Sequence, residues 1–323
     1  MAALALALLL VCGCMVAASP RCVVVRDVAS AQDVKIEAHG ANAVRVRAVV
    51  VGAQFVDDPD VVSAFTPLPS TTAAAPGVDA ECVPVDLGAA GSFVVSGNLK
   101  AALGSDGKLT FTRVSDSKTL LTEKDTRTLA PATTVPAVPG FFSLGLSFEA
   151  VEGERIYGLG QHAAFSWDPN YPAQLDQKGV GSMLLEPHDG DVTIPVAHSS
   201  LGYAFLSNLP STGSVEYNRT GTFWRHDAVL QADMWVATTS DSPPHAVSPW
   251  SQLQTAYADA TGHAPVYPAW ATGFWQSKLR YANQTQVMAV AAEHVRRGIP
   301  LSLMVIDFYS WNDPVKGRSK PPP

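Results

Sequence analysis

The sequence contains few positive charges and no basic block. Its 323 residues include 22 Lys and Arg against 29 Asp and Glu, which gives a formal net charge of −7. Nucleic-acid-binding surfaces need clustered Lys and Arg, so we expect no nucleic-acid partner. The sequence also has no Gly-rich phosphate loop, no metal-ligand cluster and no nucleophile-elbow serine, and we expect no cofactor. It does not define an oligomeric state.

Long apolar runs are missing after residue 18, so we expect no membrane contact beyond the N-terminus. Residues 1–18 predict an export signal, because residues 4–11 are wholly apolar and Ala17-Ala18-Ser19-Pro20 supplies the small residues that a signal peptidase needs. An anchored helix is one alternative, although residues 2–18 are slightly short for a span. A lipid-modified Cys14 is another. The signal predicts a secreted protein or one in the endomembrane lumen.

Cysteine is scarce, with four in the chain, and Cys12 and Cys14 leave with the signal. Cys22 and Cys82 remain, and two Cys in an oxidising compartment predict one disulfide. Such a bridge closes a loop of about 60 residues and constrains the unfolded chain by about 4 kcal/mol. Two unrelated buried thiols are the alternative.

Two N-glycosylation sequons fit a secreted eukaryotic protein. They are Asn218-Arg219-Thr220 and Asn283-Gln284-Thr285. Such triplets also arise by chance, and the first is the better candidate because it lies in a polar turn.

Residues 19–242 predict a β-sandwich, because short strand-like runs alternate with turns and no long helical pattern occurs. Residues 42–49 alternate apolar and polar, which predicts a half-buried strand, and Ser105-Asp106-Gly107-Lys108 predicts a hairpin turn. The predicted strands are Val23–Val25, Ala43–Val51, Ser92–Val95, Lys108–Val114, Phe141–Phe148 and Asp191–Val196. Residues 243–268 predict a linker that holds a short helix at 249–262.

Residues 269–311 predict a different architecture. The segment 271–275 is strand-like, 283–297 is helical, and 301–308 is an almost wholly apolar strand of the kind that a covered parallel sheet requires. Asn283 and Gln286 form a capping box at the helix start. Strand, helix and strand in this order predict a βαβ unit. The fold class is therefore mostly β, with a sandwich followed by the first unit of an incomplete (β/α)8 barrel.

Several motifs resemble glycoside hydrolase family 31, and the match runs from about residue 156 to 311. The barrel motifs are Ala271-Thr272-Gly273-Phe274-Trp275-Gln276-Ser277-Lys278-Leu279-Arg280-Tyr281, Arg296-Arg297-Gly298-Ile299-Pro300-Leu301 and Val305-Ile306-Asp307-Phe308. Upstream, Tyr157-Gly158-Leu159-Gly160-Gln161-His162 resembles a turn of the family's sandwich, and Tyr257-Ala258-Asp259-Ala260-Thr261-Gly262 resembles its linker. The resemblance is strongest to the α-xylosidase-like branch and implies a galactose-mutarotase-like sandwich.

The resemblance implies a retaining, exo-acting α-glycosidase that acts on an α-linked oligosaccharide or glycoside. Such enzymes use two carboxylates about 5 to 5.5 Å apart. In the family both are Asp, placed after later barrel strands, so we expect no catalytic residue in this sequence and no activity from it alone. The tail at 312–323 diverges from the family.

The resemblance assigns Asp307 a hydrogen bond to a sugar hydroxyl, for which a carboxylate is well suited. Trp275, Phe308 and Trp311 are expected to line the same subsite, although core packing is the alternative for Trp275. Three sandwich residues, His162, Asp168 and Asp176, are candidates to reach the barrel mouth, with ordinary loop roles as the alternative. A non-catalytic β-sandwich that binds carbohydrate or a partner protein is the alternative function.

Overall fold

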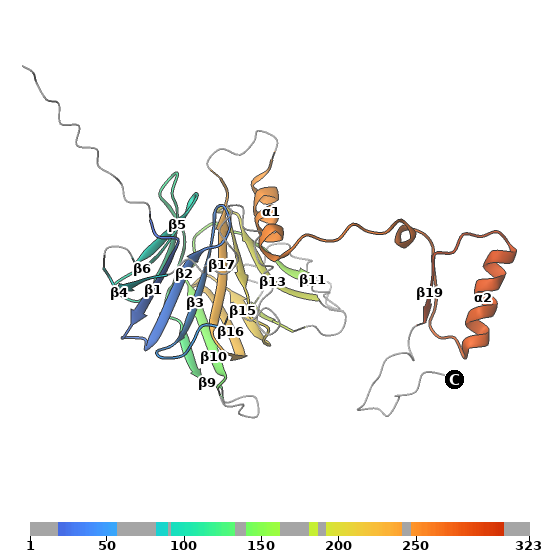
Figure 1. Cartoon of the computed structure of the whole chain (residues 1–323), viewed down its shortest axis with the longest axis horizontal. Helices are drawn as coiled ribbons and strands as arrows, with labels where there is room; N and C mark the ends of the chain where they lie inside the picture. The colour runs from blue at the N-terminus through green and yellow to red at the C-terminus, as the bar shows by residue number, and fades with distance from the viewer. Residues whose placement is uncertain are drawn as a thin grey trace, which may run out of the picture. The chain divides into compact units, whose positions relative to one another are not determined.

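A computed structural model describes residues 19–56, 82–89, 92–132, 140–161, 181–186, 192–240 and 247–306 (Figure 1). The chain divides into two units, Met1–His263 and Ala264–Pro323. None of the described helices has the length and apolar content needed to cross a bilayer. Strands dominate the first unit, which confirms the mostly β fold class.

The first unit contains seventeen of the strands in the described ranges and one helix, α1 Pro249–Thr261. The strands are β1 Cys22–Asp27, β2 Gln32–Ala38, β3 Ala43–Val50, β4 Val83–Asp86, β5 Phe93–Ser96, β6 Leu99–Leu103, β7 Leu109–Arg113, β8 Lys118–Thr122, β9 Thr128–Pro131, β10 Phe142–Phe148, β11 Ile156–Gln161, β12 Gly181–Leu184, β13 Val192–Ser199, β14 Tyr203–Ser207, β15 Gly213–Tyr217, β16 Thr222–Val229 and β17 Ala232–Thr238. All six predicted strands are present, with shifted ends. The predicted hairpin turn joins β6 to β7, where Leu103 pairs with Leu109.

These strands form three sheets. The largest has the order β11-β13-β14-β17-β3-β2-β1-β4, the second β12-β15-β16-β10-β9, and the third β5-β6-β7-β8. The first two sheets pack face to face around one apolar core. Phe205 of β14 lies 5.4 Å from Phe148 of β10 and 5.1 Å from Trp224 of β16, ring centroid to ring centroid. These rings tie the two sheets together, as a sandwich requires.

The alternating strand β3 is buried on both faces, so the prediction of a half-buried strand was wrong. Val44 and Val46 enter the core between the sheets, while Arg45 and Arg47 point to the other face and are buried there as well. Arg45 donates two hydrogen bonds to Asp233 of β17, at 2.9 and 2.6 Å. Alternation shows that two faces differ in polarity, but a polar face can still be covered when its charges are paired.

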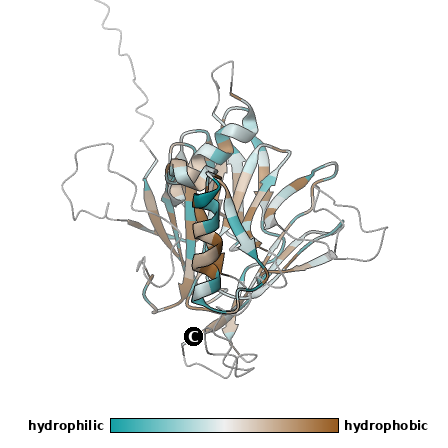
Figure 2. Cartoon of the chain, turned by 90° about the vertical axis from the view of Figure 1, so that its right-hand side faces the viewer, coloured by the Kyte–Doolittle hydropathy of each residue, from teal (hydrophilic) through white to brown (hydrophobic). Residues whose placement is uncertain are grey.

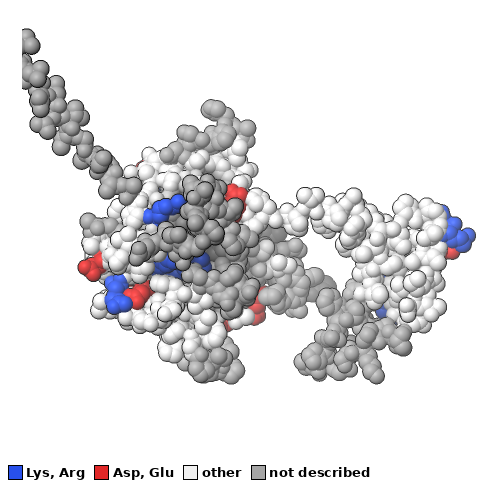
Figure 3. Space-filling view, in the orientation of Figure 1, with Lys and Arg blue, Asp and Glu red and all other residues white. Residues whose placement is uncertain are grey.

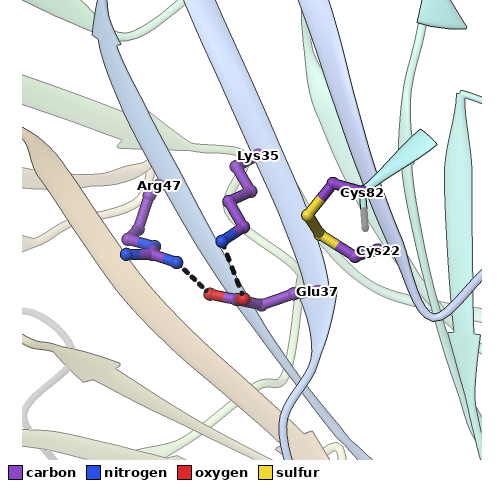
Figure 4. The surroundings of a disulfide bond; sticks show 5 residues. All are labelled: Cys22, Lys35, Glu37, Arg47 and Cys82. Atoms are coloured by element: carbon purple, nitrogen blue, oxygen red, sulfur yellow. Dashed lines mark hydrogen bonds and ion pairs between the residues drawn. A yellow bond between two sulfur atoms is a disulfide. The ribbon is translucent and has the colours of Figure 1, made fainter. Parts of the chain in front are cut away.

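Cys22 of β1 and Cys82 are joined by a disulfide, as the sequence predicted (Figure 4). Cys82 immediately precedes β4, which pairs in parallel with β1. The bridge therefore fixes the edge strand to its neighbour across a sequence separation of 60. Glu37 of β2 forms ion pairs with Lys35 at 3.3 Å and with Arg47 at 2.7 Å. Both pairs are drawn as dashed lines in Figure 4.

Helix α1 covers part of the outer face of the eight-stranded sheet. Ser248 caps it by accepting a hydrogen bond from the backbone N–H of Ser251, and Gly262 ends it. Leu253 and Ala260 are buried in a second apolar cluster with Trp235 of β17. We expected residues 243–268 to form a linker, but α1 belongs to the sandwich unit. The apolar side of α1 packs on a face of the sheet, and the length of the segment does not predict this contact.

The second unit is the predicted strand–helix–strand arrangement. It consists of the short 3-10 helix η1 Ala269–Thr272, β18 Trp275–Lys278, α2 Gln284–Arg296 and β19 Leu303–Ile306, and β18 and β19 are parallel. The first strand was expected at 271–275, where the structure has η1, so that boundary was wrong. Asn283 caps α2 by accepting from the N–H of Gln286, while Gln286 accepts from the N–H of Ala282. The helix carries both hydrophobic and hydrophilic residues (Figure 2).

Candidate functional site

In the second unit, the parallel strands β18 and β19 have their C-terminal ends at the same edge of the sheet. The register runs from Trp275 opposite Leu303 to Lys278 opposite Ile306. Active sites of βα barrels form at the carboxyl ends of their strands, so this edge is the candidate site. Asp307 follows Ile306 directly in the sequence, which is the position from which a barrel strand presents a side chain to the substrate.

Six of the candidate residues lie outside the described residues, and their expected contacts stay predictions. They are Asp307, Phe308 and Trp311 after β19, and His162, Asp168 and Asp176 after β11.

Lys278 and Tyr281 are the described residues whose side chains lie at this strand edge. The Lys278 ammonium lies 5.8 Å from the centroid of the Tyr281 ring, and that tyrosine is only 3% exposed. Gln276 donates a long hydrogen bond of 3.5 Å to the Tyr281 hydroxyl. Sequence reasoning did not select these two residues, although both lie in the 271–281 motif that carries the family resemblance.

Trp275 lies at the opposite end of β18. It is the first residue of the strand, and three residues of extended chain place it roughly 10 Å from the carboxyl edge. Its ring stacks on that of Trp270, with centroids 6.4 Å apart and an interplanar angle of 23°. This placement favours the packing role over a shared subsite with Asp307, and the sugar contact of Trp275 stays a prediction.

The Gly-rich motif of β11 forms an irregular edge strand. Gly158, Leu159 and Gly160 all have positive φ, and the register with β13 shifts between the two glycines. A Cβ at Gly160 would collide with the carbonyl oxygen of Val192, so the close approach of the strands requires glycine there. The bulge sets the direction of the chain just before His162.

A groove on the outer face of the eight-stranded sheet was not predicted. Its volume is about 580 Å³, and it is lined by Tyr157, His198, Trp250, Ser251 and Gln254. The first two residues pair across β11 and β13, and Trp250 lies over them from the first turn of α1. Burial lowers the pKa of His198, so its ring is neutral. The lining residues are far apart in the sequence, and only the packing of α1 on the sheet brings them together.

The two sequons occupy different local structures. Asn218 lies in the turn between β15 and β16, where its side-chain oxygen accepts from the N–H and the hydroxyl of Thr220, at 2.8 and 2.7 Å. Its amide donates to Glu216 at 2.8 Å. Asn283 is instead the cap of α2, with its oxygen held by the N–H of Gln286 at 3.0 Å.

Charged side chains are sparse on the face shown in Figure 3. Among the residues that the structure describes, no group of three or more His, Cys, Asp or Glu is placed to hold a metal ion. The buried carboxylates of the sandwich are paired instead: Glu123 accepts from Arg127 at 2.9 Å, and Asp233 accepts from Arg45. These pairs hold the fold together and lie in neither the groove nor the strand edge.

A family model described as the Glycosyl hydrolases family 31 TIM-barrel domain matches residues 264–318. The uncharacterized family 31 glucosidase ORF2 of Pseudescherichia vulneris is 37% identical over 176 residues, covering 54% of this chain and 30% of that protein. The α-xylosidase of Saccharolobus solfataricus is 36% identical over 177 residues, covering 53% of this chain and 23% of that protein. The chain thus spans less than a third of the length of these curated relatives.

Solved structures match the chain across both units. A GH31 α-xylosidase from a soil metagenome, complexed with xylose, is 30% identical with a TM-score of 0.66, covering 91% of this chain and 41% of that one. A xylosidase from Aspergillus niger is 25% identical with a TM-score of 0.70, covering 91% and 40%. The sandwich and the barrel opening therefore occur together in proteins of known structure.

Proposed function

We propose that the chain, which is similar to proteins of glycoside hydrolase family 31, forms the N-terminal part of a retaining, exo-acting α-glycosidase. The observation that carries this proposal is the parallel pair β18–β19, which lies within the matched barrel segment and ends directly before Asp307. An α-xyloside is the substrate expected first, because two of the relatives are named as α-xylosidases.

In this proposal the sequence supplies binding residues and no catalytic pair. The carboxylate of Asp307 accepts hydrogen bonds from a sugar hydroxyl. The nucleophile and the acid–base residue of a retaining enzyme come from later strands of the barrel. The 323 residues by themselves are therefore expected to hydrolyse no glycoside.

An assay of the purified chain tests this proposal. With nitrophenyl α-xyloside, α-glucoside and α-galactoside we expect no release of nitrophenol. Turnover that Asp307→Asn abolishes would overturn the proposal that the catalytic pair lies elsewhere. The transcript beyond Trp311 is the second test, and it is expected to continue in frame into further βα repeats with two strand-end Asp residues.

Export is part of the same proposal. The disulfide between Cys22 and Cys82 fits an oxidising compartment, and residues 1–18 precede the first strand as a removable signal would. Expression in a eukaryotic secretory host should place the chain in the medium with a new N-terminus near Ser19. Asn218 and Asn283 are the proposed glycan sites. An amidase that cleaves N-linked glycans should lower the mass of the secreted chain, and this mass loss should be absent when both Asn218→Gln and Asn283→Gln are introduced. An intracellular chain that keeps Met1 would contradict this part.

A further inference from the structure

The groove between α1 and the β11–β13 edge has the chemistry of a carbohydrate subsite. Trp250 is 43% exposed although it lies in the first turn of a helix that buries Leu253 and Ala260 on the sheet. The exposed part of this large aromatic ring borders the groove, where a ligand can stack on it. Its position is also fixed, because the Tyr157 ring meets it edge to face at 5.4 Å and His198 lies 6.3 Å away, between ring centroids.

The polar groups of the groove are arranged around that ring with hydrogen-bonding capacity to spare. The His198 Nε2 atom is buried and has no hydrogen-bond partner within the part of the chain that the structure describes. Gln254 is exposed on the same side of α1, one turn beyond Trp250, and the Ser251 hydroxyl lies between them in sequence. A ligand that brings several hydroxyl groups would satisfy these groups, because each of them can donate or accept.

The lining residues carry no formal charge. None of the five is an acid, a Lys or an Arg, and burial keeps the imidazole of His198 neutral. The described lining therefore offers no cation to a phosphate or carboxylate ligand and no carboxylate to a metal ion. The volume of about 580 Å³ falls in the roughly 300–1,000 Å³ range of small-molecule sites. These facts select a neutral ligand with an apolar face and a polar edge.

We propose that this groove binds a pyranose unit of a neutral oligosaccharide, with one sugar face stacked on Trp250 and its hydroxyl groups hydrogen-bonded to Gln254, Ser251 and His198. The site lies wholly within the sandwich unit and performs no chemistry, so it holds substrate for the enzyme without acting on it. The choice of an α-linked sugar as the ligand rests on the proposed function; the groove itself requires only a neutral sugar.

Isothermal titration calorimetry of the full chain with isomaltotriose tests the proposal. We expect measurable binding that Trp250→Ala weakens about tenfold or more, because the stacking surface is lost. Gln254→Ala is expected to weaken it about threefold to tenfold. The second variant is needed because the Gln254 side chain is exposed and forms no hydrogen bond within the described ranges, so its truncation leaves the fold intact even where the loss of Trp250 does not.

Two control variants separate this groove from the barrel site. Trp270→Ala removes an exposed tryptophan of the second unit and should leave the affinity unchanged. Asp307→Asn removes the proposed contact at the strand edge and should affect binding at that edge only, so binding in the groove should persist in this variant. Binding that disappears in Asp307→Asn but persists in Trp250→Ala would overturn the groove and support the barrel edge. No binding at millimolar isomaltotriose, or a Trp250→Ala variant that alters only the oligomeric state, would overturn the carbohydrate assignment, and neither result bears on the activity of the longer enzyme.

Discussion

The sandwich unit and the barrel unit differ in how much of their own surface they cover. Two sheets and α1 give the sandwich an inner and an outer apolar cluster, with Trp224 and Trp235 fully buried. In the described residues of the barrel unit, 264–306, Tyr281 alone is buried. Large apolar side chains are exposed there, with exposed fractions of 77% at Val295 and 95% at Val266. A sandwich closes a core by itself, whereas a single βαβ unit covers one side of its sheet and leaves the rest to neighbouring repeats.

A truncation inside the sandwich should show the largest contrast. Trp224 is 1% exposed and lies against Phe205 and Tyr217, so Trp224→Ala leaves a cavity that the core cannot fill. We expect the free energy of unfolding of the sandwich to fall by about 3–5 kcal/mol in urea titrations followed by circular dichroism. Met288→Ala, at a 61% exposed position of α2, is the control and should change it by less than about 0.5 kcal/mol. Equal losses of unfolding free energy in the two variants would contradict the expected difference between the sandwich unit and the barrel unit.

Ion pairs provide the second comparison. Asp233→Ala leaves the buried guanidinium of Arg45 without its carboxylate, and we expect a loss of about 3 kcal/mol in the same titration. Glu293 pairs with Arg296 and Arg297 on the exposed surface of α2, where water screens the charges. Glu293→Gln should therefore leave the urea concentration at the midpoint of unfolding unchanged. A stable Asp233→Ala variant would show that Arg45 finds another partner or reaches solvent.

The pH dependence of stability should come from the sandwich. Burial lowers the pKa of His226 from 6.5 to about 4, and its ring is hydrogen-bonded to the Ser207 hydroxyl at 2.8 Å. Between those two values the unfolded chain binds more protons than the folded one, so stability falls as the pH decreases. The expected loss from His226 between pH 7 and 4.5 is about 2 kcal/mol.

His226→Gln tests this expectation in urea titrations at several pH values. The variant should have a flatter pH profile, with part of the slope kept by His39, whose pKa burial also lowers to about 4. His263→Gln, at an exposed position after α1, should keep the profile of the parent chain. An unchanged slope in His226→Gln would assign the pH dependence to other groups.

The smallest effects are expected at the helix caps. Asn283→Ala and Ser248→Ala each remove a side-chain acceptor from a helix N-terminus and should lower the free energy of helix opening by about 1 kcal/mol. Amide hydrogen exchange measures this separately in α1 and α2. Because α1 buries Leu253 and Ala260 and α2 buries no residue, the amides of α1 should stay the better protected in both variants. Stronger protection in α2 would show that the barrel unit has a core of its own.

Much of the fold was predictable because local signals agreed with it. The apolar–polar pattern and turns of residues 21–240 predicted strands, and Asn283 marked the start of α2. The two Cys that remain after the export signal predicted the disulfide. Three features were not predictable from local sequence. The burial of Arg47, the attachment of α1 to the sandwich and the shift of the first barrel strand to Trp275 all depend on what packs against each segment.

The sequence by itself indicated the resemblance to glycoside hydrolase family 31 and the order of the two architectures, because motifs and hydrophobic periodicity are local properties of the chain. It also placed Asp307 near the end of a predicted parallel strand, at 301–308. Only the tertiary structure separated Trp275 from that edge, since position along a strand decides which end a side chain occupies. It also assembled the groove from Tyr157, His198 and Trp250, which lie up to 93 residues apart (250 − 157) and meet through the pairing of β11 with β13 and the packing of α1 on the sheet.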